Sequence, residues 1–249
     1  MKKVILCGAL GNMGKTTAEV ASLREDIGII LGVDKEEVLL EDFSVVDNFS
    51  KVKKQADVLI DFSHSSVLND LLEFCIKNKV PLVSCTTGLT KSLEEKIKRA
   101  SRIIPVFRSE NMSISMNFVI KICKLAAKSL ENFDIEIVER HHNQKLDAPS
   151  GTALILANTM SEAKKNKRTY VYDRHEEQKK RQANEIGISS VRGGTIAGDH
   201  EIMYAGRYET LSIRHVAQSR KVFAVGAINA AIFLADKSPG FYDMSDLFG

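Results

Sequence analysis

The first 34 residues constrain the fold more strongly than any other part of the chain. An apolar run at 4–7 ends on Gly8. Apolar residues at helical spacing follow at 12–23, and a second apolar run occupies 27–33, just before Asp34. Strand, glycine turn, helix and strand in this order form a βαβ unit, in which a helix connects two parallel strands. The beginning of the chain therefore predicts an α/β domain built on a parallel sheet.

The same alternation continues as far as residue 107. Short apolar runs and amphipathic stretches predict strands at 58–62, 81–85 and 103–107 and helices near 66–77 and 91–100. Short, fully apolar strands separated by helices are typical of a parallel sheet that is covered on both faces. We therefore expect an N-terminal, doubly wound sheet of the Rossmann type.

The pattern changes after this region. It predicts helices at 115–130, 153–163 and 220–235 and strands at 134–138, 186–192, 201–205 and 209–215. Turns are expected at three glycine positions, Gly193-Gly194, Gly198-Asp199 and Gly206. The charged stretch 162–185 reads as a helix end, a loop and an edge strand. This part is expected to be a smaller α+β domain with a mostly antiparallel sheet.

Composition and charge limit the functional classes. The 249 residues are 44% hydrophobic and 27% charged with a net charge of +3, so bulk charge gives no argument for nucleic-acid binding. The apolar run at the N-terminus is too short for a signal peptide, and no stretch approaches the roughly eighteen apolar residues of a membrane span. We expect a soluble, cytoplasmic protein with no nucleic-acid or membrane partner.

The cysteines and one basic cluster favour structural roles. Neither C-x-x-C pairs nor Cys/His ligand spacing occurs, so we expect four reduced thiols and no metal site, at Cys7, Cys75, Cys85 and Cys123. A nucleic-acid-binding function would depend on the basic residues Lys164, Lys165, Lys167 and Arg168. Glu176 and Glu177 follow them closely, which favours a solvated face.

The glycine turn predicts a dinucleotide site. The run Gly8, Ala9, Leu10, Gly11, Asn12, Met13 and Gly14 lies between the first strand and the first helix. Gly8 allows a tight turn, Gly11 lets the backbone approach a pyrophosphate, and Gly14 lets the helix pack closely on the sheet. The G-x-x-G-x-x-G spacing is a weak signal alone. Asp34 strengthens it, because an acid there accepts hydrogen bonds from a ribose, although a surface turn can also carry an aspartate. Lys35 could meet a 2′-phosphate, so NADH and NADPH both remain open.

The run from Glu139 to Ala153 concentrates chemistry in fifteen positions. It contains adjacent imidazoles at His141 and His142, an ammonium at Lys145 and a Ser-Gly-Thr turn at 150–152. Imidazoles exchange protons near neutral pH, and a helix that starts at the turn would attract an anion. The pattern predicts a proton donor beside an anion site, the alternative being a solvated polar loop.

Cys85-Thr86-Thr87-Gly88 ends a predicted strand at the carboxyl edge of the sheet. Ligands of such sheets bind at that edge, so these residues are candidates for contact with the nicotinamide half of a cofactor. A plain Thr-Gly turn is the alternative.

Together these motifs resemble the 4-hydroxy-tetrahydrodipicolinate reductase (dihydrodipicolinate reductase) family along essentially the whole chain. The resemblance rests on the segments G-A-L-G-N-M-G, C-T-T-G, E-N-M-S, H-H-N-Q-K-L-D-A-P-S-G-T-A, V-R-G-G-T-I-A-G-D-H-E and R-H-V-A-Q-S-R-K-V-F-A. It implies reduction of a small cyclic dicarboxylate by NADH or NADPH, in diaminopimelate and lysine biosynthesis. It also implies a discontinuous dinucleotide-binding domain of 1–112 with 220–249, a substrate domain at 113–219, and a homotetramer formed through the second domain.

The resemblance also implies roles for single residues. His141 looks like the proton donor and Lys145 like its catalytic and substrate-binding partner. Further substrate contacts fall on His142, Ser150, Gly151 and Thr152. Besides the glycine run, Asp34 and Lys35, cofactor contacts fall on Cys85, Thr86, Thr87, Ser109, Glu110, Asn111, Met112, Arg220 and Phe223.

Two departures from the family pattern affect the expected site. Cys85 replaces a glycine, so a side chain could crowd the nicotinamide, and Ser115-Met116-Asn117 replaces Gly-Val-Asn at a hinge. The sequence leaves two other functions open. A dehydrogenase with a cysteine nucleophile would need an activated Cys85. A non-catalytic NAD(P) sensor would leave His141 and Lys145 without a purpose.

Overall fold

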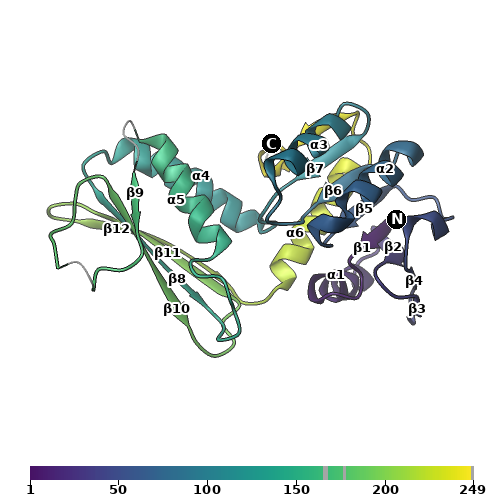
Figure 1. The fold of residues 1–249 in the computed structure, drawn as a ribbon, viewed down its shortest axis with the longest axis horizontal. Helices are drawn as coiled ribbons and strands as arrows, with labels where there is room; N and C mark the ends of the chain where they lie inside the picture. The colour runs from purple at the N-terminus through teal and green to yellow at the C-terminus, as the bar shows by residue number, and fades with distance from the viewer. Residues whose placement is uncertain (165–167, 176–177, 248–249) are drawn as a thin grey trace. The chain divides into compact units, whose positions relative to one another are not determined.

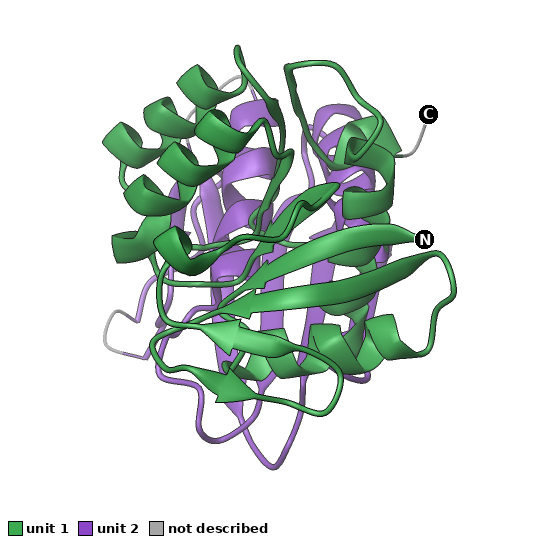
Figure 2. Ribbon diagram, turned by 90° about the vertical axis from the view of Figure 1, so that its right-hand side faces the viewer, with its two compact units in different colours: residues 1–114, 220–249 green, residues 115–219 purple. Residues whose placement is uncertain are grey.

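The computed structural model describes residues 1–249 apart from 165–167, 176–177 and 248–249. The chain divides into two compact units (Figure 2). Unit 1 comprises Met1–Ile114 and Arg220–Gly249, and unit 2 comprises Ser115–Ser219. In the described parts of the chain, no helix is long and apolar enough to cross a membrane.

Unit 1 contains an eight-stranded sheet in the order β13-β7-β6-β5-β1-β2-β4-β3. The strands are β1 (Lys2–Cys7), β2 (Ile27–Val33), β3 (Val38–Leu39), β4 (Ser44–Val46), β5 (Val58–Asp61), β6 (Leu82–Ser84), β7 (Pro105–Arg108) and β13 (Gly240–Tyr242). Every pairing is parallel except that of β3 with β4. The predicted doubly wound sheet is therefore confirmed. The short strands β3, β4 and β13 were not predicted.

Helices cover both faces of this sheet (Figure 1). Its helical segments are α1 (Asn12–Ser22), η1 (Phe49–Lys51), η2 (Ser65–Val67), α2 (Leu68–Asn78), α3 (Lys91–Ala100), α6 (Lys221–Leu234) and α7 (Met244–Leu247). Alternate residues of β1 point to opposite faces, so Val4 and Leu6 pack in one core with α1 and α6. Ile5 and Cys7 pack in the other core with α2 and α3. Gly226 lets α6 approach the backbone at Met112 closely, since a Cβ on Gly226 would lie 1.7 Å from the Met112 carbonyl oxygen.

Unit 2 has a five-stranded sheet in the order β12-β11-β8-β10-β9, with two helices over one face (Figure 1). The elements are α4 (Ile114–Ser129), β8 (Asp134–His141), α5 (Gly151–Ala163), β9 (Thr169–Val171), β10 (Glu185–Arg192), β11 (Gly198–Ala205) and β12 (Thr210–Ala217). The prediction of an edge strand is confirmed by β9.

The second sheet is mixed. β11 pairs antiparallel with β8 and β12, but β10 pairs in parallel with β8 and β9. The expectation of a mostly antiparallel sheet therefore missed half of the pairings, because the helix between β8 and β10 forms a crossover that returns the chain in the same direction. The predicted turn at Gly198-Asp199 is also wrong, since these residues begin β11.

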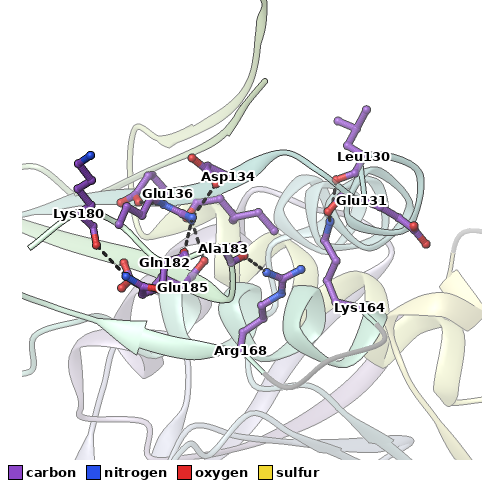
Figure 3. A network of polar contacts seen from close by, with 12 residues as sticks. Leu130, Glu131, Asp134, Glu136, Lys164, Arg168, Lys180, Gln182, Ala183 and Glu185 are labelled. Carbon is purple, nitrogen blue, oxygen red and sulfur yellow. Dashed lines mark hydrogen bonds and ion pairs between the residues drawn. The ribbon is translucent and has the colours of Figure 1, made fainter. Parts of the chain in front are cut away.

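The basic stretch after α5 has internal partners where it is described (Figure 3). The Lys164 ammonium donates to the carbonyls of Leu130 (2.6 Å) and Glu131 (3.0 Å), just beyond the last turn of α4. Burial lowers the pKa of Lys164. Arg168 donates to the Ala183 carbonyl. These two side chains therefore have structural contacts; Lys165, Lys167, Glu176 and Glu177 lie outside the described residues.

Candidate functional site

The nucleotide turn, residues 8–14 between β1 and α1, is shaped by missing side chains. Gly8 has φ +77°, and a Cβ there would lie 2.7 Å from the Phe62 carbonyl. A Cβ on Gly14 would lie 2.1 Å from the Gly8 carbonyl oxygen, whereas one on Gly11 would meet the same oxygen at 3.4 Å. Gly11 is the N-cap of α1, and no side chain caps this helix. The turn thus leaves a helix N-terminus accessible to an anion.

Asp34 connects the end of β2 to this turn. One carboxylate oxygen accepts the Leu10 N–H at 2.8 Å, and the other accepts the Lys35 N–H at 2.8 Å. A cavity of about 950 Å³ is lined by Gly8, Gly11, Asp34 and Lys35 among others. The predicted residues around the glycine turn are therefore brought together, except that Ala9 is buried in the core and Leu10 and Met13 pack against it. Asn12 is exposed at the start of α1.

The loop after β6 is held by a buried carboxylate. Thr86 donates its hydroxyl to Asp61 at 2.8 Å, and Ser63 donates to the same carboxylate at 2.6 Å. Burial raises the pKa of Asp61, against the effect of its hydrogen bonds. Thr87 is exposed, while the Cys85 side chain packs in the core and does not project from the loop.

The other predicted cofactor residues of unit 1 occupy two places. After β7, the Ser109 hydroxyl donates to the Asn111 carbonyl at 2.7 Å, and Glu110 lies 3.6 Å from the Arg108 guanidinium. Met112 is buried in the core. At the start of α6, Arg220 is the exposed N-cap and Phe223 packs against the core.

None of the four thiols is suited to act as a nucleophile. All are free and buried. Burial raises the pKa of Cys7, Cys75 and Cys85 and raises that of Cys123 to about 11. An activated cysteine needs a lowered pKa, so the alternative of a cysteine-dependent dehydrogenase has no support here.

The histidine cluster of unit 2 comprises Glu139, His141, Ser150, Arg192 and His200. Glu139 and His141 are two positions apart on β8 and therefore share the face that the helices cover. Their side chains meet at 2.6 Å, between His141 Nδ1 and Glu139 Oε2. His141 is 8% exposed and Glu139 is fully buried.

Glu139 also accepts hydrogen bonds from Arg192 and Ser150. Arg192 donates through both terminal nitrogens, at 2.7 and 2.9 Å, and the Ser150 N–H donates at 3.1 Å. Burial alone would raise the pKa of Glu139, but the hydrogen bonds from His141 and Arg192 outweigh it and hold that pKa well below its usual range. Glu139 reciprocally raises the pKa of Arg192. The carboxylate is therefore an ionised, fixed anion.

His200 completes the cluster from the neighbouring strand. Its Nε2 lies 2.8 Å from the Ser150 hydroxyl, which also accepts the Ala153 N–H at 3.1 Å as the N-cap of α5. The predicted helix start at the Ser-Gly-Thr turn is confirmed. The ring of His200 stands 5.2 Å from that of His141. Burial, together with the charge of His141, lowers the pKa of His200 to about 4, so His200 is neutral at pH 7.

The remaining predicted residues lie around this cluster. Lys145 pairs with Asp147 at 2.8 Å, and the Arg192 guanidinium donates to the Asp147 carbonyl at 2.6 Å. His142 is half-buried. Gly151 and Thr152 form the first turn of α5, and a Cβ on Gly151 would meet nothing within 4 Å. Among the residues described, no group of His, Cys, Asp and Glu is arranged to hold a metal ion.

Comparison with known families agrees with both units. The model for the N-terminus of dihydrodipicolinate reductase matches residues 2–112, and the model for its C-terminus matches 115–248. The chain belongs to the dihydrodipicolinate reductase family. It is therefore an oxidoreductase, and the predicted family is confirmed.

Similar proteins span the whole chain. A protein of Caldanaerobacter subterraneus subsp. tengcongensis named 4-hydroxy-tetrahydrodipicolinate reductase is 47% identical, with 99% of this chain and 98% of the other covered. One of the same name from Clostridium novyi is 44% identical, with the same shares covered. The solved structure of dipicolinate-bound dihydrodipicolinate reductase from Paenisporosarcina sp. TG-14 has a TM-score of 0.80 at 23% identity, covering 98% of this chain and 97% of the other. That likeness shows a shared fold.

In this member of the reductase family, sequence reasoning did not assign roles to three residues of the histidine cluster. Arg192 and His200 lie on strands whose pairing with β8 was not foreseen. Glu139 could have been found, because its spacing of two from His141 on a predicted strand puts both on one face.

Proposed function

We propose that the protein reduces 4-hydroxy-tetrahydrodipicolinate to tetrahydrodipicolinate with NADH or NADPH, in diaminopimelate and lysine biosynthesis. The ring gains a hydride and a proton, and its 4-hydroxyl group leaves as water. The observation that carries the proposal is the buried imidazole of His141, held at Nδ1 by an ionised carboxylate beside the start of α5. The names of the similar proteins support the reaction. The dipicolinate bound to the Paenisporosarcina protein supports a small cyclic dicarboxylate as substrate.

The nucleotide turn fits a nicotinamide dinucleotide. A side chain at Gly8 or Gly14 would overlap neighbouring backbone atoms, so the tight turn depends on glycine at both positions. Gly11 presents the uncapped N-terminus of α1. Pyrophosphate would bind there, and Asp34 would accept from a ribose. We propose the loops at 85–87 and 109–112, with Arg220 and Phe223, as further contacts. When bound, the cofactor supplies a hydride to an unsaturated carbon of the substrate ring.

The residues of unit 2 would bind the substrate and supply the proton. The first turn of α5, Ser150 to Thr152, offers N–H groups and hydroxyls to one carboxylate. Lys145 and His142 would contact the other carboxylate. Because Glu139 occupies Nδ1 of His141, Nε2 is the nitrogen left to protonate the ring carbon next to the site of hydride addition.

A direct assay tests the reaction and the donor together. Purified protein is mixed with the product of dihydrodipicolinate synthase and, in parallel assays, with NADH or NADPH, and the absorbance of the reduced nicotinamide is followed. His141→Gln should lower kcat about a hundred- to ten-thousand-fold with a smaller effect on KM, because a positioned general acid contributes that much. Absence of turnover by the unaltered protein would refute the reaction. A normal kcat in the variant would remove His141 from the mechanism.

We also propose a homotetramer that forms through the open face of the second sheet, the face opposite α4 and α5. Val191 and Val216 point to this face and are 44% and 52% exposed. Asp199 there pairs with both Arg140 and Arg214. Val216→Asp should reduce the mass measured by light scattering. Leu211→Asp is the control, because Leu211 lies on the same strand, β12, and is similarly exposed but points to the other face of the sheet.

A further inference from the structure

The carboxylate of Glu139 holds His141 from one side of its ring. It accepts from Nδ1, so the neutral imidazole carries its hydrogen there and Nε2 faces away from the carboxylate. Glu139 also accepts from Arg192 on β10 and from the Ser150 N–H at the start of α5. Three elements thus fix one carboxylate, and the carboxylate fixes the ring.

Arg192 determines the plane of this carboxylate. Its two terminal nitrogens each donate to a different oxygen of Glu139, which is the two-pronged geometry that a guanidinium forms and an ammonium cannot. The guanidinium is also held by the Asp147 carbonyl. A rotation of Glu139 would break both contacts, so the ring of His141 has one orientation.

Gly198 leaves room at the opposite side of the ring. A Cβ at this position would lie 3.3 Å from His141 Nε2 and 3.7 Å from Cδ2. The backbone of Gly198 does not need glycine, since its φ is not positive, and it pairs regularly within β11. The absence of a side chain at Gly198 therefore leaves the space beside Nε2 open.

We propose that Glu139 is a positioning residue that acts through His141, and that Gly198 keeps open the space from which Nε2 delivers its proton. The inference rests on the proposed function, because it assumes that His141 is the donor. The charged or titratable side chains around the ring are Glu139 on β8, Arg192 on β10 and His200 on β11.

A double-mutant cycle tests the role of Glu139. Glu139→Gln keeps the shape but not the charge, and kcat should fall about 10- to 100-fold, as when the partner of a functional histidine is removed. KM should change about twofold at most. In the His141→Gln background, Glu139→Gln should cause no further loss.

The outcomes separate the two proposals. A fully active His141→Gln refutes the proposed donor and this inference with it. An impaired His141→Gln with an unimpaired Glu139→Gln, or with losses that multiply in the double variant, leaves the donor in place and overturns the role of Glu139. If Glu139→Gln does not fold, Arg192→Lys takes its place in the cycle, because it keeps the charge but loses the two-pronged contact.

Gly198→Ala tests the space at Nε2 without touching Glu139. The added methyl must push the ring by a few tenths of an ångström, and kcat should fall about tenfold, since catalysis is sensitive to such misplacement. Gly193→Ala is the matched control, because a Cβ there meets nothing within 4 Å and kcat should not change. Equal kcat values for both variants, with the same melting temperature as the unaltered protein, overturn the role of Gly198.

Discussion

The nucleotide turn and the histidine cluster, the two sites proposed to bind ligand groups, are built by opposite physical means. The turn uses seven consecutive residues and relies on backbone N–H groups and missing side chains. The cluster gathers residues from β8, β10, β11 and α5 and relies on buried charge. Substitutions in the turn should therefore act by steric overlap and be nearly independent of pH. Substitutions in the cluster should act by uncompensated charge and change how the protein responds to pH.

The largest effect is expected at Gly14. Gly14→Ala places a methyl 2.1 Å from the Gly8 carbonyl oxygen, so the backbone of the turn must move. The dissociation constant for NADH should rise a hundredfold or more, about 2.7 kcal/mol, measured by calorimetry. Gly11→Ala is the comparison, since its methyl meets only ordinary contact at 3.4 Å within the protein and can weaken binding only by crowding the pyrophosphate. The melting temperature should therefore fall in Gly14→Ala and stay unchanged in Gly11→Ala; equal melting temperatures would show that steric overlap does not set the turn.

The two sites also differed in how far the sequence predicted them. The turn is contiguous, so its glycines could be assigned from their place between a strand and a helix, with Asp34 at the end of the next strand. In the structure Gly8, Gly11 and Asp34 line one cavity. The cluster depends on which strands pair. Arg192 reaches Glu139 only because β10 runs parallel to β8, and the charged stretch that precedes β10 gave no sign of that direction. The local sequence predicted that α5 starts after Ser150. The pairing of distant strands leaves no such periodic pattern in the sequence.

A second prediction tests charge in the cluster through His200. The pKa of this group is lowered from 6.5 to about 4 in the folded protein, so the unfolded chain binds a proton first as the pH falls. The associated stability is present above pH 6.5 and is lost as the pH falls toward 4. Between pH 7.5 and 5 the free energy of unfolding should fall by about 2 kcal/mol more in the unaltered protein than in His200→Gln.

Urea denaturation at the two pH values measures this difference. The comparison at pH 7.5, where His200 is neutral, supplies the internal control, because there the two proteins differ only in packing and in the bond to Ser150. Parallel pH dependences would mean that His200 is not kept neutral by burial, and the contrast between the two sites would lose its basis.

Asp34 is an exception to the contrast between a turn built from backbone and a cluster built from charge. It is a charged side chain outside the turn that contacts the turn's backbone. Its carboxylate accepts the Leu10 N–H and lines the same cavity as Lys35. In Asp34→Asn the dissociation constant for NADH should rise about tenfold, the loss of one hydrogen bond to a charged group. Binding of NADPH should weaken less or improve, since a 2′-phosphate would no longer face an anion. Lys35→Met should do the reverse, weakening NADPH alone. We expect the unaltered protein to bind both cofactors, and calorimetric titration of each cofactor into the unaltered protein and both variants tests this. Binding of only one cofactor by the unaltered protein would contradict that expectation. If neither substitution changes the ratio of the two dissociation constants, shape rather than charge selects the cofactor.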